Sequence, residues 1–272
     1  YTNINNYHFI TEARYNGTRI VTICPDFSAS AVQADLWVPV NIGTDAALAL
    51  SMAHVIVKEK LYKADFIAEQ TDLPILVRDD NKKFLRQADM QRGGRDDVYY
   101  FWDKTTRRIV EAPWKSIALG NIVPALEGEY EANTVRGKVK VRPVFELLKK
   151  RLEDYTPEKA SKITGTSPRL IEKLARDIAA AKGVVNVSTF NWGKFYNGDE
   201  IERSIILIFS LCGHMGRKGA TYNAFTSLSL DATVTGIALN PNIMLRVAAS
   251  SDPRYAGWRN AGYTDEMIIM EY

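Results

Sequence analysis

Three short stretches of the sequence combine acidic, glycine and aromatic residues in patterns that could hold a nucleotide or another planar ligand. They are Pro25-Asp26, Gly43-Thr44-Asp45 and the stretch from Asn191 to Lys194, which reads Asn-Trp-Gly-Lys. Each is predicted to lie at the carboxyl end of a short strand. Ligands of parallel α/β sheets bind outside the carboxyl ends of the strands, so all three are candidate binding segments.

The first two stretches each have two interpretations. A carboxylate at Asp26 could accept hydrogen bonds from a ribose, although Pro-Asp is also ordinary turn chemistry. Gly43 allows close approach to the backbone, and the start of the helix that follows favours anions. Asp45 could accept hydrogen bonds from two adjacent N–H donors on the edge of a guanine. Thr44 or Asp45 could equally cap that helix, and both roles can coexist.

The third stretch offers an aromatic ring and a cation. Trp192 could stack on a planar ring, and Lys194 could contact a phosphate or a polarised ring oxygen, with Asn191 and Gly193 completing the loop. The alternative is a surface loop whose lysine lays its alkyl stem along apolar surface. The sequence indicates no residue as a catalytic acid or base.

The remaining reactive residues favour structural interpretations. His214, Arg217 and Lys218 follow a predicted helix, where cations match the negative end of the helix dipole. Cys24 and Cys212 are predicted to be small buried core residues. The chain has 3 histidines, far apart in sequence, and 2 cysteines, so we expect no metal site built from this chain alone.

The composition is that of a globular protein. The 272 residues are enough for one large domain or two small ones, and the 46% hydrophobic and 25% charged content excludes a disordered chain. A formal net charge of +3 without long single-sign blocks predicts no nucleic-acid partner. The most apolar run, 205–212, is too short for a membrane span. The chain begins with Tyr1 rather than Met, so we expect a piece of a longer protein or a processed chain.

Strands alternate with helices through much of the chain. Strands are expected at 19–24, 36–40 and 184–188, and helices at 8–15, 46–60, 64–70, 144–152, 157–164, 168–181 and 198–211. This order predicts an α/β fold with a Rossmann-like parallel sheet flanked by helices. Residues 81–142 interrupt it with two expected β-hairpins, typical of an inserted surface region. From Gly213 onward the sequence predicts mostly loop.

Several motifs follow one another as in one known family. They are HFITEARY (8–15), Pro25-Asp26, ADLW (34–37), GTDAAL (43–48), YTPEKA (155–160), ITG (163–165), SLCG (210–213) and GRKG (216–219). The chain therefore resembles the molybdopterin oxidoreductases, the dimethyl sulfoxide reductase family, from near Tyr1 to about Tyr222. EQTDLP (69–74), LVR (76–78), FLR (84–86) and YFWD (100–103) resemble its type II branch. That branch includes nitrate, selenate and (per)chlorate reductases, nitrite oxidoreductases, and dimethyl sulfide and ethylbenzene dehydrogenases.

The resemblance implies a cofactor and a domain organisation. Residues 1–222 would form an α/β domain that binds molybdenum bis(molybdopterin guanine dinucleotide), with 81–142 as a surface insertion. Residues 223–272 would be a loop-rich segment leading to a following domain. By the resemblance, Asp26 meets the nucleotide, Gly43, Thr44 and Asp45 grip the guanine end, and the stretch from Asn191 to Lys194 approaches a pterin near the metal. The 4Fe-4S cluster and the molybdenum ligand belong to a preceding part of such subunits, so this chain alone is expected to be inactive.

The function implied is part of a catalytic alpha subunit that transfers an oxygen atom to or from a nitrate- or nitrite-type oxyanion. Electrons would pass through iron–sulfur clusters to an iron–sulfur beta subunit, with a haem subunit as a further partner. The periplasmic side is favoured over the cytoplasmic face of the membrane. Alternatives are another type II enzyme or a non-catalytic nucleotide-binding or assembly module. An NAD-binding Rossmann enzyme is disfavoured because no Gly-x-Gly-x-x-Gly follows the first strand.

Overall fold

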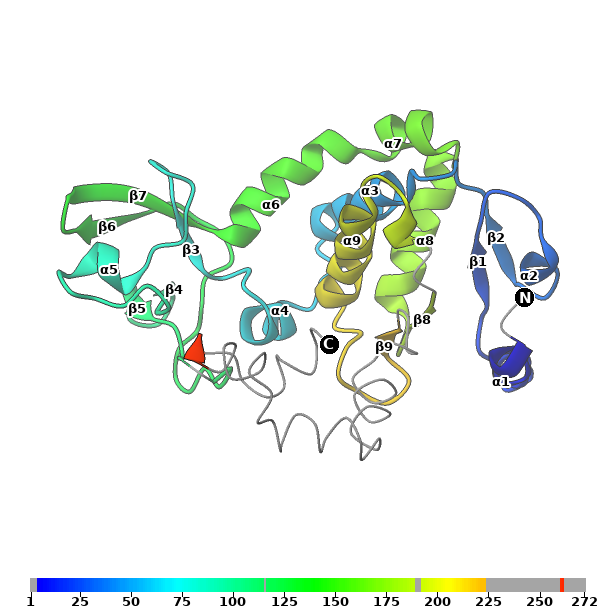
Figure 1. Cartoon of the computed structure of the whole chain (residues 1–272), viewed down its shortest axis with the longest axis horizontal. Helices are drawn as coiled ribbons and strands as arrows, with labels where there is room; N and C mark the ends of the chain where they lie inside the picture. Colours follow the sequence, from blue (N-terminus) through cyan, green and yellow to red (C-terminus); the bar gives the residue numbers. More distant parts are fainter. Residues whose placement is uncertain (1–3, 115, 189–191, 224–259, 262–272) are drawn as a thin grey trace. The chain divides into compact units, whose positions relative to one another are not determined.

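The computed structural model describes residues 4–114, 116–188, 192–223 and 260–261 (Figure 1). The chain divides into two compact units, one formed by residues 1–186 and 191–222 and the other by residues 187–190 and 223–272. Almost all of the second unit lies outside the described residues, so the elements below lie wholly or mainly in the first.

The N-terminal part contains a parallel strand pair. Its elements are α1 (Ile4–Tyr15), β1 (Val21–Ile23), α2 (Ala29–Val32) and β2 (Leu36–Val38). β1 and β2 pair in parallel, and α2 lies in the connection that parallel strands require. Asp35, directly before β2, links this strand to β1 and α1. Its carboxylate accepts from the backbone N–H of Ile20, directly before β1, at 2.8 Å and forms an ion pair with Arg14 of α1 at 3.1 Å.

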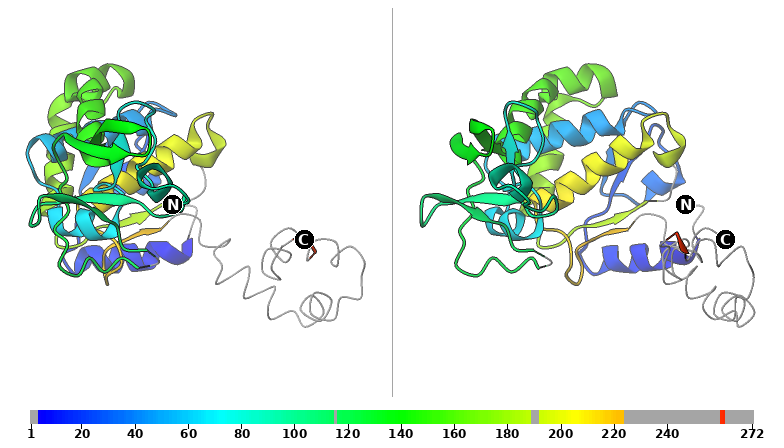
Figure 2. Two further views of the ribbon diagram at one scale, coloured as in Figure 1. Left: turned by 90° about the vertical axis from the view of Figure 1, so that its left-hand side faces the viewer. Right: turned by 60° about the vertical axis from the view of Figure 1, so that its left-hand side comes forward.

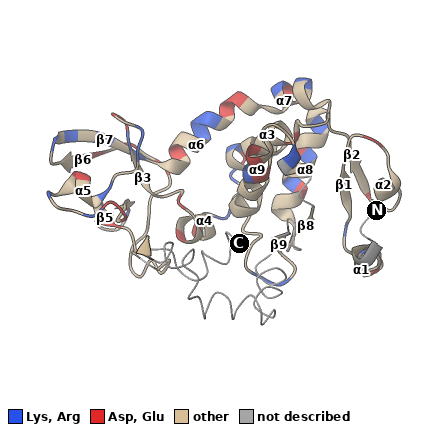
Figure 3. Ribbon diagram, in the orientation of Figure 1, with Lys and Arg blue, Asp and Glu red and all other residues tan. Residues whose placement is uncertain are grey.

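A bundle of helices surrounds α3, the most apolar helix. The bundle consists of α3 (Asp45–Lys58), α4 (Ala64–Gln70), α6 (Val144–Leu152), α7 (Pro157–Thr164), α8 (Pro168–Ala180) and α9 (Gly198–Leu211). Ten of the fourteen residues of α3 are buried, as expected for a helix that is apolar on all sides. α3 and α9 lie side by side (Figure 2). The outer helices α6, α7 and α8 carry interspersed charges of both signs (Figure 3).

The sequence determines where two of these helices begin. The hydroxyls of Thr156 and Ser167 accept hydrogen bonds from backbone N–H groups three residues later, each at 3.4 Å. Pro157 and Pro168 occupy the first helical positions, where a missing N–H costs nothing. Gly165 ends α7 at φ +74°, a conformation that favours glycine.

The middle of the chain forms antiparallel hairpins with a core of their own. The elements are β3 (Leu76–Arg78), α5 (Gln87–Met90), β4 (Tyr100–Asp103), β5 (Arg108–Glu111), β6 (Tyr130–Thr134) and β7 (Gly137–Pro143). β7 pairs with both β3 and β6, and β4 pairs with β5. Their shared core contains Leu76, Leu85 and Val141, and the ring of Trp102 stacks on Tyr130 at 4.1 Å.

Short elements complete the described structure. Two 3₁₀ turns, Glu153–Tyr155 and Trp192–Lys194, precede α7 and α9, and β8 (Val185–Val187) pairs with β9 (Thr221–Asn223). In the described part of the chain, no helix is long and apolar enough to span a membrane.

The mixture of helices and strands is confirmed, and so are the two expected hairpins. The predicted Rossmann-like parallel sheet is not confirmed. Among the described strands, β1 and β2 form a parallel sheet of two, whereas the pairings of β3 to β7 are antiparallel. The reason is where the chain goes after β2. It enters α3, which packs among helices, and the next strand, β3, pairs with β7 instead of extending the first sheet.

Candidate functional site

A pocket of about 330 Å³ opens at the carboxyl ends of β1 and β2. It is lined by Pro25, Pro39, Val40, Asn41, Ile42, Thr164 and Gly165. The segment after β2 and the end of α7 thus form its walls. The position of this pocket is that in which ligands of open α/β sheets bind.

Asn41 joins the two walls of the pocket. Its backbone N–H donates to the carbonyl of Thr164 at 2.8 Å, and its side-chain amide donates to the carbonyl of Ile163 at 2.9 Å. A Cβ at Gly165 would lie 3.2 Å from the side-chain oxygen of Asn41, closer than most such contacts. Both this contact and the positive φ therefore favour glycine at position 165.

Asp26 lies in a turn beside the pocket-lining Pro25. Its carbonyl accepts from the backbone N–H of Ser28 at 2.9 Å and from the thiol of Cys24 at 3.0 Å. The indole of Trp37 donates to the carbonyl of Cys24 at 3.1 Å, which fixes the turn against β2. The backbone thus has the turn conformation that Pro-Asp predicts, and the Asp26 side chain is exposed. Its contact with a ribose stays a prediction.

The second stretch makes the sharp turn into α3. Gly43 has φ +77°, which favours glycine there. Thr44 occupies the N-cap position, but its hydroxyl donates to the carbonyl of Asn41 at 2.7 Å and does not accept from the helix. Side-chain capping by Thr44 is therefore absent. Asp45 is the first residue of α3, where a negative charge suits the helix dipole.

The structure brings the second and third stretches together. The side chain of Trp192 hydrogen-bonds to the carboxylate of Asp45, so the indole N–H is the donor. The ring of Phe195 lies 3.5 Å from the position that a Cβ on Gly43 would take. Sequence reasoning missed Phe195, whose only signal was an aromatic residue directly after the third stretch.

Burial changes the acidity of Asp45. Desolvation raises the pKa of its carboxyl group, and hydrogen bonds from its own backbone N–H and from Trp192 oppose that rise. Lys194 in the third stretch is exposed. Asn191 lies outside the described residues, and of Gly193 only the backbone is described.

His214 is not the helix-end cation that the sequence suggested. It is buried, its Nε2 lies 2.8 Å from the carbonyl of Ile178, and Nη2 of Arg217 lies 3.4 Å from its Nδ1. Because a carbonyl only accepts, Nε2 carries the proton and Nδ1 accepts from Arg217. Burial lowers the pKa of His214, which favours the neutral ring. Lys218, like Arg217, is exposed.

The two cysteines differ. Cys212 is buried in the helical core as predicted, and burial raises the pKa of its thiol to about 12. Cys24 is half-buried and not part of that core, because its thiol reaches out to the turn at Asp26.

The residues at the strand ends fit one end of a nucleotide better than a metal ion. A half-buried carboxylate, an indole and a glycine turn at a helix start suit a base and its phosphates. Within the described ranges, no group of three or more His, Cys, Asp or Glu residues is placed to hold a metal ion. The arrangement can bind and orient a cofactor.

Most of the chain is similar to part of several known alpha subunits. Perchlorate reductase subunit alpha from Dechloromonas aromatica is 43% identical over 82% of this chain and 27% of that protein. Dimethylsulfide dehydrogenase subunit alpha from Rhodovulum sulfidophilum is 41% identical over 80% of this chain and 24% of that protein. Respiratory nitrate reductase subunit alpha from Haloferax mediterranei is 34% identical, with 80% and 24% covered. The chain spans about a quarter of the length of these relatives.

A family model covers nearly the whole chain. The model described as molybdopterin oxidoreductase matches residues 2–259, which includes every candidate binding residue named above. This family is built around a molybdenum–pterin cofactor, which the match implies for this protein as well. The chain belongs to the molybdopterin oxidoreductase family.

Proposed function

We propose that the chain is the dinucleotide-binding part of the catalytic alpha subunit of a molybdenum oxidoreductase. The cofactor would be molybdenum bis(molybdopterin guanine dinucleotide), which when bound supplies oxygen-atom transfer at the metal. The observation that carries the proposal is the hydrogen bond from Trp192 to Asp45, because it joins two of the three candidate stretches at the start of α3.

Each stretch has a proposed role in binding the cofactor. Asp45 would accept hydrogen bonds from the two N–H donors of the guanine, and Gly43 and Thr44 would let the nucleotide approach the start of α3. Asp26 would accept from the ribose. The stretch from Asn191 to Lys194, with Trp192 and Gly193, would face a pterin. The chain thus positions and tunes the cofactor, which carries out the reaction itself.

The proposed domain comprises residues 1–222, with β1 and β2 as part of a Rossmann-like sheet that binds the dinucleotide. Residues 81–142 would be peripheral to the cofactor. The separate hydrophobic cores of the helical bundle and of the hairpins support that division. Residues 223–272 would lead to a following domain.

The proposed substrate is an oxyanion of the nitrate or nitrite type. Reductases of perchlorate and nitrate among the relatives support the oxyanion class. The identity of 43% to the perchlorate reductase exceeds the 34% to the nitrate reductase, so chlorate or perchlorate is the leading alternative. Selenate, dimethyl sulfide and ethylbenzene complete the set to be assayed.

The relatives are named alpha subunits, which supports partner subunits for this protein. We propose an iron–sulfur beta subunit and a haem subunit, with a 4Fe-4S cluster in the alpha subunit outside this chain. The proposed location is the periplasmic side of the membrane.

The test measures cofactor content in the intact protein. Acid hydrolysis should release about two GMP per molybdenum from the wild type, because each of the two proposed dinucleotides contains one guanine nucleotide. Asp45→Asn should lower the content of GMP and molybdenum, since the side-chain amide offers a donor where two N–H donors must be accepted. Asp65→Asn is the matched control, because Asp65 is an exposed aspartate in the first turn of another helix.

Two results would count against the proposal. If the intact protein contains no pterin, the proposed function is wrong. If the Asp45→Asn protein has the GMP and molybdenum content of the control, only the proposed role of Asp45 is wrong. A panel of nitrate, nitrite, chlorate, perchlorate and selenate with the loaded enzyme then decides the substrate.

A further inference from the structure

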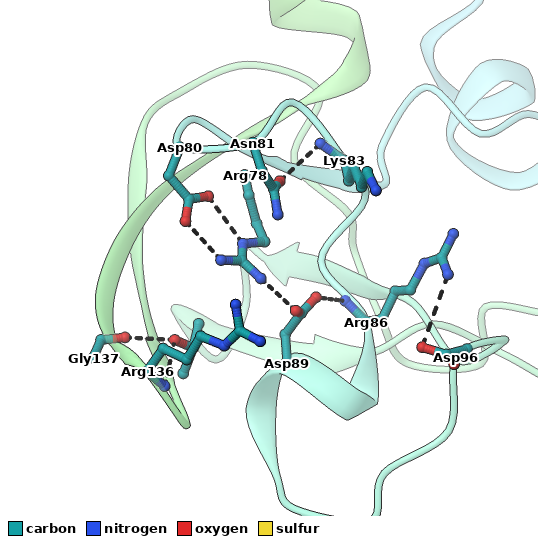
Figure 4. Close-up of polar contacts among 10 residues, drawn as sticks. Arg78, Asp80, Asn81, Lys83, Arg86, Asp89, Asp96, Arg136 and Gly137 are labelled. Atoms are coloured by element: carbon teal, nitrogen blue, oxygen red, sulfur yellow. Dashed lines mark hydrogen bonds and ion pairs between the residues drawn. The ribbon is translucent and has the colours of Figure 1, made fainter.

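A second pocket lies in the hairpin region, apart from every residue given a role above. The pocket has a volume of about 300 Å³ and lies between β3, α5 and the turn that joins β6 to β7 (Figure 4). Its charged lining residues are Arg78, Lys83, Arg86, Asp89, Asp96 and Arg136, which we call the polar pocket. Four of the six are cations.

Arg78 is paired with two neighbouring carboxylates. Its Nε and Nη2 donate to the two carboxylate oxygens of Asp80 at 3.0 and 2.6 Å, and its Nη1 donates to Asp89. The second oxygen of Asp89 accepts from the backbone N–H of Arg86 at 3.0 Å. With only 6% of its surface exposed and three of its five N–H groups donated to these carboxylates, Arg78 forms a fixed wall of the pocket.

Arg86 has a weaker ion pair than Arg78, and its guanidinium carbon lies 6.0 Å from the centre of the Tyr99 ring. Its Nη1 lies 3.8 Å from a carboxylate oxygen of Asp96, whose side chain is 80% exposed. Its Nε is buried and, among the described residues, has no hydrogen-bond partner. A buried donor without a partner loses its interaction with water and gains nothing in return. An acceptor entering the pocket would restore that hydrogen bond.

Two further cationic residues, Lys83 and Arg136, line the pocket. Lys83 and Arg136 are placed by their backbones, whose N–H groups donate to the side chains of Asn81 and Thr134 at 3.0 and 3.2 Å. Across the described ranges, neither side chain has an ion pair within 4.0 Å. Figure 4 shows the guanidinium of Arg136 directed toward the Arg78–Asp89 pair. Arg86 therefore has one distant carboxylate partner, Asp96, and Lys83 and Arg136 add two positive charges to the lining of the pocket.

We propose that the polar pocket binds one small oxyanionic group. A carboxylate or tetrahedral oxyanion accepts side-on from Nε and one Nη of an arginine, the edge that Arg86 leaves unsatisfied. Arg136 and Lys83 line the same pocket and add positive charge that favours an anion. The group is either a free oxyanion or a carboxylate of a polypeptide that docks at the hairpins. Molybdenum content plays no part in this binding.

The test is calorimetric titration of the intact protein at constant ionic strength, with chloride as the balancing anion. One arm uses sodium sulfate, and the other uses N-acetyl-glutamate amide, a peptide-like carboxylate. Arg86→Gln should weaken the binding that the wild type shows by about tenfold or more, since a charged hydrogen bond is lost. Arg92→Gln is the matched control, because Arg92 is exposed in the same hairpin region and does not line the pocket.

A second variant tests the proposal even if Arg86→Gln disturbs the folding of the hairpin region. Arg136→Gln should also weaken binding, and the exposed Arg136 side chain makes no ion pair whose loss could unfold the region. Tighter binding of sulfate identifies a free oxyanion, and tighter binding of the glutamate derivative identifies a polypeptide carboxylate. Absence of binding in both arms overturns the proposal, as does equal binding by Arg86→Gln, Arg136→Gln and Arg92→Gln proteins.

Discussion

Replacing Arg78 by glutamine should destabilise the hairpin region markedly. Arg78 is buried and makes three charge-assisted hydrogen bonds to Asp80 and Asp89. Removing one partner of a buried pair costs about 3–5 kcal/mol when the other charge stays buried. Asp80 and Asp89 are 46% and 25% exposed, so water takes over part of the lost interaction. We therefore expect a loss of about 2–3 kcal/mol in the free energy of unfolding.

The chain contains a natural control with the same geometry. Arg95 also donates through Nε and Nη2 to both oxygens of an aspartate two residues later, Asp97, at 2.8 and 2.7 Å. Both side chains are about half exposed, so Arg95→Gln should cost clearly less than Arg78→Gln. Urea unfolding of the intact protein, followed by tryptophan fluorescence, reports on the region because Trp102 packs against its core. Equal losses for the two variants would refute the argument that burial makes the difference.

Three further predictions concern other positions. Gly165→Ala should lower the free energy of unfolding by about 1–2 kcal/mol, because the φ of +74° lies in the left-handed region and a Cβ would crowd Asn41. Thermal unfolding of the variant measures this loss. Hydrogen bonds from Thr106 and the Val123 backbone, among others, hold the pKa of Asp103 at about 2, below its usual 3.8. Its stabilisation is therefore complete above pH 4 and is lost as the pH falls toward 2, so an Asp103→Asn variant should lose less stability than the wild type over that range. Cys212, with its thiol pKa near 12, should resist iodoacetamide at pH 8 in the folded protein and react after unfolding, as peptide mass spectrometry can show.

The elements that the sequence predicts well are those whose signals are local. The start of α7 follows from Thr156 and Pro157, and that of α8 from Ser167 and Pro168, because caps depend on neighbouring residues alone. α3 follows from a long apolar run. β3, with three residues, is too short to show a period, and its partner β7 lies about sixty-five residues away in sequence. The same limit applies to α2 and α5, which contain four residues each.

The same distinction between local and non-local signals applies to the candidate site. The turn at Gly43 and the start of a helix at Asp45 are local features that the sequence indicates. The contact between Asp45 and Trp192 depends on the packing of α9 on α3, and no pattern within either stretch encodes it. For the same reason the sequence could not separate capping from ligand binding at Thr44, whose hydroxyl turned out to bond to Asn41.

The direction of a pKa shift distinguishes Asp45 from the aspartates that hold the fold together. Asp35 and Asp103 accept several hydrogen bonds from the backbone and from side chains, and their pKa values are lowered. Asp45 lies half-buried with one side-chain donor, and desolvation raises its pKa. A glutamate on α9, Glu202, shares that direction, but it does not follow a strand end or a glycine turn. A carboxylate that is desolvated but incompletely paired weakens the fold, and such exceptions concentrate at functional sites. This environment supports the proposal that Asp45 binds a ligand, in which a guanine would supply two donors beside the one from the Trp192 indole.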